Sequence, residues 1–184
     1  YVTKMVVGKS DWGHTRMGAY GRDSHDIIPI PKCHVITPQL RAACNAVAHH
    51  VIDLDIFPYE EETGRGVLRY VVMRQSRVND EILLTLVTAR RPRILHDLAE
   101  RLTEAVPEIV GVHVHVNSEP GNAIYNMSEE GIGSLRLEGR LAIEEKLAGV
   151  RLQVGPGDFF QANPGTADLL VSDVVELLKD DRDR

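Results

Sequence analysis

Val67-Leu-Arg-Tyr-Val-Val-Met-Arg-Gln75 and Glu81-Ile-Leu-Leu-Thr-Leu-Val-Thr88 are the two runs that decide the fold. Both are dominated by branched apolar residues, which favour extended backbone on a buried or half-buried sheet surface. The intervening Asn79-Asp80 is a turn pair, because both residue types tolerate the backbone angles that reverse a chain. The sequence therefore predicts a β-hairpin over residues 67–88, around which the other elements assemble.

Short extended segments separated by turn residues occur on both sides of this hairpin. Alternating or apolar runs predict strands over 1–9, 16–20, 26–30, 110–117, 135–138, 141–145 and 150–154, with brief extended pieces at 55–59 and 122–126. Apolar residues at helical spacing predict helices over 38–52, 93–105 and 164–178. Strands outnumber helices and cluster as hairpins. We therefore predict an α+β fold, a mixed or antiparallel sheet with helices packed on one face.

The composition is that of an ordinary globular protein, with 43% hydrophobic and 26% charged residues among 184. This length supports one domain with its own core, or one domain and part of another. No apolar run approaches the roughly 20 residues that a membrane-spanning helix needs, and no signal peptide is visible. We therefore expect a protein without a membrane partner.

The charges are unevenly distributed around a formal net charge of −6, which argues against a chain coated all over by nucleic acid. Residues 1–50 carry six basic and three acidic side chains, whereas residues 94–184 carry eight basic and seventeen acidic ones. The segment between them holds seven arginines, which are Arg65, Arg69, Arg74, Arg77, Arg90, Arg91 and Arg93. Two basic zones beside an acidic half predict that a polyanion binds one face only. The alternative is that these arginines are solvated strand and loop residues.

A second informative stretch is Gly155-Pro-Gly-Asp-Phe-Phe-Gln-Ala-Asn163, between the strand expected at 150–154 and the last helix. It contains two of the three phenylalanines of the chain. Aromatic rings and carboxamides in a turn punctuated by Gly and Pro suit a planar polar ligand such as a nucleobase. The alternative is that Phe159 and Phe160 are core residues, and that Gln161 and Asn163 cap the following helix.

Motifs for several common chemistries are absent from the sequence. No GxGxxG or Walker loop offers a phosphate cradle, and no CxxC, HExxH or GxSxG pattern supplies a metal or nucleophile site. His113 and His115 share one side of an expected strand, so they could form a zinc site with Cys33 and Cys44. The commoner explanation for such histidines is an alternating polar face of a sheet. Cys44 lies in a helical pattern and is expected to be a small core residue, whereas Cys33 lies in a turn between two prolines.

Six segments, taken in order, resemble the RNA (uracil-5-)-methyltransferases that use S-adenosylmethionine. They are Tyr1-Val-Thr-Lys4, Gly21-Arg-Asp-Ser-His-Asp-Ile-Ile-Pro-Ile-Pro-Lys-Cys33, Thr63-Gly-Arg-Gly-Val-Leu-Arg-Tyr-Val-Val-Met-Arg74, Val114-His-Val-Asn117, Ile143-Glu-Glu-Lys-Leu-Ala-Gly149 and Asp158-Phe-Phe-Gln-Ala-Asn163. Together they span almost the whole chain, and they are most similar to the branch that modifies ribosomal RNA and carries a 4Fe–4S cluster. The sequence departs from that pattern at Val2 and Thr3, where the family commonly has Arg-Asn, and at Gly157, where the ribosomal branch often has a basic residue.

The resemblance implies that residues 1–150 are the family's central RNA-positioning domain and that residues 151–184 begin the methyltransferase domain. It implies that Gln161 contacts S-adenosylmethionine, that Phe159 lies against the flipped-out target uracil, and that Asn163 belongs to the same substrate-binding motif. Cys33 aligns with the last of four cysteines that hold the cluster. Because the other three lie upstream in the family and a cluster needs four thiolates, we expect no cluster in this chain.

The same resemblance places the family's catalytic groups downstream of residue 184, namely a cysteine that attacks C6 of uracil and a carboxylate that removes the C5 proton. We therefore expect no catalytic residue in this chain and no methyl transfer by the chain alone. The first hypothesis is a fragment of a cytoplasmic RNA uracil-C5 methyltransferase, with ribosomal RNA favoured over transfer RNA and no DNA expected. The alternative is a non-catalytic RNA-binding module in which the basic zone at 65–93 carries the function.

Overall fold

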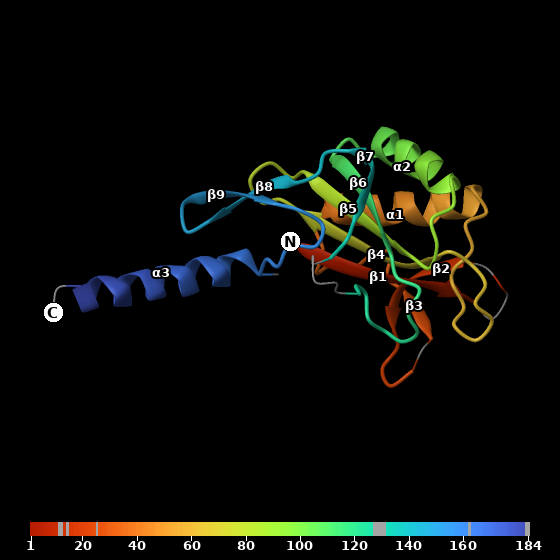
Figure 1. Ribbon diagram of the computed structural model, residues 1–184, viewed down its shortest axis with the longest axis horizontal. Helices are drawn as coiled ribbons and strands as arrows, with labels where there is room; N and C mark the ends of the chain where they lie inside the picture. Colours follow the sequence, from red (N-terminus) through yellow and green to blue (C-terminus); the bar gives the residue numbers. More distant parts are fainter. Residues whose placement is uncertain (11–12, 14, 25, 127–131, 162, 183–184) are drawn as a thin grey trace.

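A seven-stranded mixed sheet forms the centre of the molecule, with strand order β3-β2-β1-β4-β5-β6-β7 (Figure 1). The computed structural model describes residues 1–10, 13, 15–24, 26–126, 132–161 and 163–182. The strands of this sheet are β1 (Val2–Lys9), β2 (Thr15–Tyr20), β3 (Ile27–Pro29), β4 (Leu68–Gln75), β5 (Ile82–Thr88), β6 (Ile109–Val116) and β7 (Leu135–Gly139). Neighbouring strands pair antiparallel, apart from the parallel pair β5 and β6. The predicted α+β class with a mixed sheet is confirmed.

The predicted hairpin is the middle of this sheet. β4 and β5 pair antiparallel from Leu68 opposite Thr88 to Gln75 opposite Ile82. The backbone N–H of Ser76 donates to the Glu81 carbonyl across 2.8 Å, and Asp80 in the turn has a positive φ of 61°. An aspartate tolerates this left-handed conformation better than most residues, so the turn follows directly from the local sequence.

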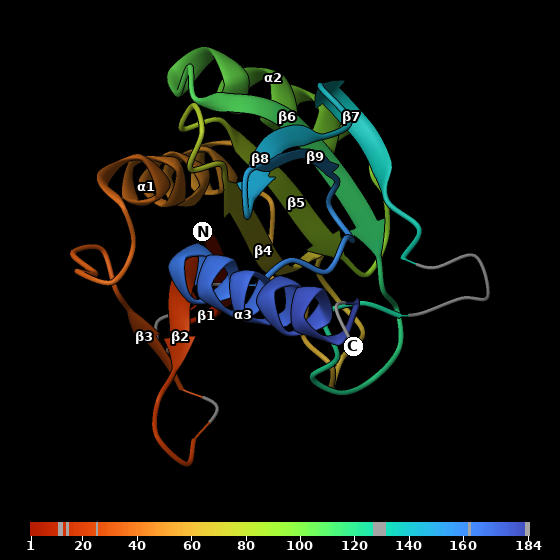
Figure 2. The ribbon, with the colours of Figure 1, turned by 90° about the vertical axis from the view of Figure 1, so that its left-hand side faces the viewer.

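Two helices cover one face of the sheet, as Figures 1 and 2 show. Helix α1 (Pro38–Asp53) begins after Thr37, whose side chain accepts a hydrogen bond from the Leu40 N–H at 3.2 Å, with Pro38 in the first turn. This is the capping arrangement that satisfies one of the unpaired N–H groups at a helix start. Helix α2 (Ile94–Ala105) is the crossover that makes the parallel pairing of β5 and β6 feasible.

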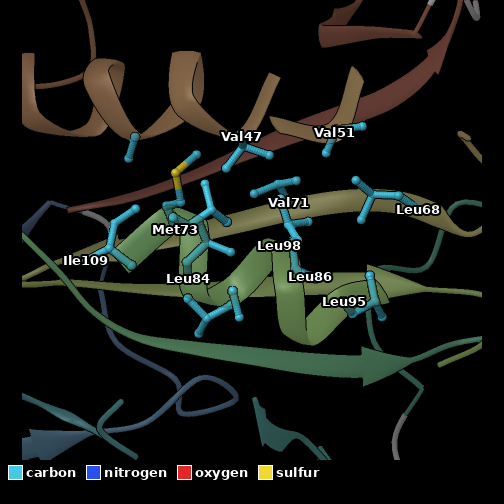
Figure 3. Close-up of a cluster of buried hydrophobic side chains, with 14 of the residues drawn as sticks. Val47, Val51, Leu68, Val71, Met73, Leu84, Leu86, Leu95, Leu98 and Ile109 are labelled. Atoms are coloured by element: carbon cyan, nitrogen blue, oxygen red, sulfur yellow. The ribbon is translucent and has the colours of Figure 1, made fainter. Parts of the chain in front are cut away.

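The hydrophobic core lies between these helices and the sheet, and Figure 3 shows its centre. Val47 and Val51 of α1 point down to Val71 of β4, and Leu98 of α2 belongs to the same cluster as Leu86 of β5. These side chains are almost fully buried. Removing this much apolar surface from water is the main source of stability for a fold of this size.

The last part of the chain, from β8 onward, lies outside the seven-stranded sheet. Strands β8 (Ile143–Leu147) and β9 (Val150–Val154) form a separate antiparallel hairpin, and helix α3 (Pro164–Arg182) extends away from the body (Figure 1). Asp168, near the start of α3, accepts hydrogen bonds from both terminal nitrogens of Arg77 at 2.6 and 2.9 Å. These bonds join the helix to the turn after β4. Among the described residues, no helix is long and apolar enough to cross a bilayer.

Most of the expected elements are present, with two differences. Residues 122–126 were expected to be extended but form no strand, because they cross the sheet face as a loop. Residues 55–59 contribute an isolated bridge, between Pro58 and Leu68. The domain boundary expected between residues 150 and 151 falls inside β9, close to its start. That division stays a prediction.

The core makes a stability prediction. Leu84 of β5 is fully buried in the centre of the sheet, so Leu84→Ala should lower the free energy of unfolding by about 2–5 kcal/mol, through lost burial and the cavity left behind. Urea denaturation of the chain would measure this. Val35→Ala is the control, since Val35 is 93% exposed and its removal should change stability by less than about 0.5 kcal/mol. A loss below about 1 kcal/mol for Leu84→Ala would contradict the packing described.

Candidate functional site

The face of the sheet opposite α1 and α2 is covered by loops and one turn. A small apolar cluster of Val6, Tyr70 and Val87 lies on this face, and Ile124 and Tyr125 pack over it. The loop residues come from the segment between β6 and β7, while the turn is the stretch 155–163. We call this surface the open face, because in the described part of the chain no helix packs over it as α1 and α2 do on the other side (Figure 2).

The turn at 155–163 is bound to the sheet through Arg74. One terminal nitrogen of Arg74, Nη2, donates to the backbone carbonyl of Asp158 at 2.6 Å, although the two residues are 84 positions apart. The Asp158 carboxylate in turn accepts the Gly155 N–H at 2.7 Å, which closes the turn on itself. A side chain at Gly157 would collide with Ile132, so the turn also approaches the preceding loop closely. The start of the turn is therefore held by specific contacts.

The aromatic and amide side chains that follow are displayed to solvent. Phe159 is 86% exposed, Phe160 is half-buried and Gln161 is exposed. Burial of Phe159 in the core, one of the two explanations offered by the sequence, is thus wrong. Phe159 is therefore an exposed ring on an anchored turn.

Asn163 has a structural task at the start of α3. Its side-chain oxygen, Oδ1, accepts the Thr166 N–H at 3.2 Å, and its carbonyl accepts the Ala167 N–H at 3.1 Å. These bonds are those of a helix N-cap. Helix capping was the alternative for this residue, and it is confirmed. A contact between Asn163 and substrate stays a prediction, as do the roles of Phe159 and Gln161.

A cavity of about 180 Å³ adjoins the start of the turn on the open face. We call it the Arg74 cavity, and its walls are Val2, Lys4, Val72, Arg74, Leu83, Thr85, Ile124, Tyr125, Pro156, Gly157 and Asp158. Burial lowers the pKa of the Arg74 guanidinium and raises the pKa of the Tyr125 hydroxyl. The sequence alone could not identify this cavity, because its walls come from β1, β4, β5, the loop and the turn.

A second cavity, of about 500 Å³, lies further along the open face, among Tyr20, Tyr59 and Tyr70. Arg69 at its edge is buried and donates to the carbonyls of Asn117, Glu119 and Gly121 at 2.6–2.9 Å. A further bond joins Arg69 to the Glu61 carboxylate at 2.7 Å. Arg69 therefore holds the loop after β6 in place.

The basic zone at 65–93 is not one surface, and this corrects the sequence-based expectation. Arg69 and Arg74 are buried, and Arg77 is bound to Asp168. The exposed members are Arg65, Arg90, Arg91 and Arg93. Two of these, Arg65 and Arg90, line a cavity of about 350 Å³ beside Phe57. The arginines of this zone lie on different elements and meet different partners, which a count of charges cannot reveal.

The four candidate zinc ligands do not come together. His115 uses both ring nitrogens, one toward the Gly133 carbonyl at 2.8 Å and one accepting the Asn126 N–H at 3.3 Å. His113 is buried on the open face, whereas Cys44 is part of the core on the α1 face. Among the described residues, the one grouping of three metal-ligating side chains is His49, His50 and Asp53, on the surface at the end of α1. An ion pair between His49 and Asp53 at 3.2 Å accounts for that grouping.

The residues present do not by themselves fit a 4Fe–4S cluster. The chain has two cysteines, while a cluster takes four thiolates. Cys33 is half-buried, and Cys44 is buried in the core as the helical pattern predicted. Burial, together with the neighbouring Cys33, raises the pKa of the Cys44 thiol to about 12, so it stays protonated at neutral pH. A role for Cys33 as one ligand among several stays a prediction.

Comparison with known proteins gives a consistent result. The chain is 31% identical to an uncharacterized RNA methyltransferase of Geobacter sulfurreducens over 86% of its own length and 31% of the relative's. It is 29% identical to an uncharacterized RNA methyltransferase of Synechocystis, over 94% of the chain and 36% of that relative. No protein-family model matches the chain. The chain spans about a third of the length of these curated relatives.

A solved structure shares the fold. The tRNA (uracil-54, C5)-methyltransferase of Pyrococcus abyssi, solved in complex with S-adenosyl-L-homocysteine, superimposes with a TM-score of 0.73. The match covers 96% of this chain and 40% of the other, with 22% sequence identity. The chain is thus similar to proteins named RNA methyltransferases and shares its fold with the solved structure.

The buried His113 makes a pH-dependent stability prediction. Burial, reinforced by Arg136, lowers the pKa of His113 to about 4, and neither ring nitrogen has a hydrogen-bond partner in the described part of the chain. Unfolding returns the imidazole to a pKa of about 6.5, so between these values the unfolded state binds more protons. The folded state should therefore lose stability as pH falls from about 6.5 to about 4, by on the order of 2–3 kcal/mol.

His113→Phe isolates this contribution, because it keeps a ring and removes the titrating nitrogens. Urea denaturation at pH 4.5 and pH 7 should show a smaller pH difference for His113→Phe than for the wild type. His49→Gln is the control, since His49 is exposed and the difference should persist. An equal pH difference in His113→Phe and the wild type would show that His113 does not carry the effect.

Proposed function

We propose that this chain is part of an S-adenosylmethionine-dependent RNA uracil-C5 methyltransferase. In this proposal the turn at 155–163 and the adjoining open face form one wall of the pocket for uracil and cofactor. The observation that carries it is the exposed ring of Phe159, beside the exposed carboxamide of Gln161, on a turn that Arg74 fastens to the sheet. The similarity to proteins named RNA methyltransferases over most of the chain supports the same assignment.

The proposed role of Phe159 follows from the geometry of the target atom. C5 of a uracil stacked in RNA is difficult to reach, so an enzyme that acts there must take the base out of the stack. An aromatic platform replaces part of the lost stacking and contributes about 1–3 kcal/mol per base. Phe159 presents such a platform, and its attachment to an anchored turn limits the entropy lost when the base binds.

Gln161 supplies the polar part of the proposed wall. A carboxamide offers both donors and an acceptor, which suits the mixed polar edge of a cofactor or base. S-adenosylmethionine would provide an electrophilic methyl group when bound. We assign no catalytic residue to this chain; its proposed contribution is to hold the base and to shape one side of the pocket.

The exposed apolar surface of α3 fits the same proposal. Six aliphatic side chains of this helix are between 44% and 69% exposed, namely Leu169, Leu170, Val174, Val175, Leu177 and Leu178. A patch of this kind usually marks a protein contact. We propose that it packs against the rest of the methyltransferase domain, of which residues 151–184 are the first part.

The proposal also covers the cellular compartment, the class of RNA and the role of Cys33. We propose a cytoplasmic enzyme that acts on RNA, with ribosomal RNA favoured by the sequence resemblance. Transfer RNA is the competing target, because the similar solved structure is named for a transfer RNA uracil. Cys33 would be one of four cluster ligands in a longer protein of the ribosomal branch. Methylation assays on ribosomal and transfer RNA transcripts, with iron analysis of the longer protein, would distinguish these options.

Substitution of the two exposed side chains tests the central claim. In the longer protein, Phe159→Ala and Gln161→Ala should each lower methyl transfer to uracil by at least about tenfold, since each removes a contact to the base or cofactor. Transfer of a tritiated methyl group to RNA measures this. Val150→Ala and Gln153→Ala are the matched controls on β9, because both side chains are exposed and precede the turn. Wild-type rates for both turn variants would end the assignment.

A second candidate function is RNA binding without catalysis. It is favoured by Arg65 and Arg90, which line the cavity beside the half-exposed Phe57 at the other end of β4. If this surface binds single-stranded RNA, the affinity should fall with rising salt, with a logarithmic slope of about −0.7 per phosphate neutralised. Arg65→Ala combined with Arg90→Ala should make the slope shallower. A flat salt dependence of the wild-type chain would exclude this function.

A further inference from the structure

We propose that the Arg74 cavity is a phosphate site, and that it binds a backbone phosphate of the RNA beside the nucleotide that Phe159 contacts. This deepens the proposed function and rests on it for the identity of the ligand, although the site itself is argued from geometry. Nothing in the sequence comparison points to this cavity. Its walls are the open face of β1, β4 and β5, the loop at Ile124 and Tyr125, and the turn at 156–158.

The first argument is an unpaired buried cation. Arg74 is 9% exposed, and of its three nitrogens only Nη2 has a hydrogen-bond partner among the described residues, the Asp158 carbonyl. Nε and Nη1 are buried without one. A buried donor left unsatisfied costs about 1–3 kcal/mol, and more when it carries charge. Two donor nitrogens of Arg74 therefore lack a hydrogen-bond acceptor among the described residues.

The second argument is the chemistry of the other walls. Lys4 contributes a second cation, and its ammonium lies over the Tyr70 ring at 5.5 Å, a position held by a cation–π contact. Thr85 and Tyr125 add hydroxyl groups, and these two side chains also interact with each other. Lys4, Arg74, Thr85 and Tyr125 thus all line one small volume. This combination favours an anion with several oxygens.

The charges of Asp158 and Glu145 both raise the pKa of Arg74, but among the described residues neither carboxylate is hydrogen-bonded to it. The Asp158 side chain is directed to the Gly155 N–H. Glu145 is buried and contributes to the electrostatics of Arg74, but its carboxylate lies 3.9 Å from Nε of Arg77 instead. A guanidinium presents its five N–H donors along different edges of a plane. With one hydrogen of Nη2 committed to Asp158, Nε and Nη1 remain, on separate edges, and each can donate to an anion oxygen.

The location selects RNA as the source of that phosphate. Asp158, whose carbonyl Arg74 holds, is directly followed by Phe159. A phosphate bound by Arg74 would therefore lie next to the base platform, where a flipped nucleotide needs its backbone fixed. The same guanidinium would hold both the turn and the phosphate, which links RNA binding to the position of Phe159.

Nuclear magnetic resonance of the chain tests the site with defined probes. The Nε–Hε signal of Arg74, identified by its absence in Arg74→Lys, should move and saturate on titration with inorganic phosphate, and at lower concentration with uridine 3′,5′-bisphosphate. Sodium acetate at equal ionic strength should move it less and saturate only at higher concentration, because a carboxylate lacks the third oxygen that Lys4 and the hydroxyls would bind. Lys4→Ala should weaken the binding of uridine bisphosphate at least about fivefold, which corresponds to one lost ionic contact.

Lys146→Ala is the matched control, because the Lys146 side chain is exposed and lies outside the cavity. It should bind uridine bisphosphate like the wild type. Equal loss in Lys146→Ala and Lys4→Ala, no movement of the Arg74 signal, or an equal response to acetate would each overturn the phosphate site. If these occur while Phe159→Ala still abolishes methyl transfer, this inference fails and the proposed function stands. If the phosphate site behaves as expected but the longer protein transfers no methyl group to RNA, the site stands and the proposed function fails.

Discussion

Burial of both faces of β4 is the constraint on which the rest of the structure depends. On one face Leu68, Val71 and Met73 pack into the core beneath α1. On the other, Arg69 and Arg74 are also buried, and a buried guanidinium must find acceptors. Both find them in backbone carbonyls of distant segments: three in the loop after β6 and one in the turn at Asp158. Arg69 and Arg74, on one face of β4, thus hold the loop after β6 and the turn at Asp158 in place.

This arrangement explains why an exposed aromatic ring can have a defined position. A phenylalanine on an unattached loop would sample many orientations and would lose that freedom on binding. Here the carbonyl of Asp158, the residue before Phe159, accepts a charge-assisted hydrogen bond from Arg74 of the central strand β4. The ring is therefore exposed to solvent on a turn that is attached to the central strand of the sheet.

The local elements were predictable because their determinants are adjacent in sequence. The hairpin of β4 and β5 follows from two apolar runs and the Asn79-Asp80 turn, and the start of α1 follows from Thr37 and Pro38. The exposure of Phe159 was not predictable, since the same residues could equally have formed a strand-end core cluster. Asn163 did cap α3, as one of the two alternatives held. Residues 122–126 have a strand-like composition, but their place is determined by packing over the sheet.

The sequence by itself determined the α+β class, the central hairpin, the main helices and the location of an unusual aromatic turn, because periodicity and turn chemistry act over a few residues. Only the tertiary structure decided which arginines are buried. It also decided that Cys44 and His113 lie on opposite faces of the sheet and that the turn meets the open face. The physical reason is that partners such as Arg74 and Asp158, 84 residues apart, are chosen by the pairing of strands, and no local pattern contains that information.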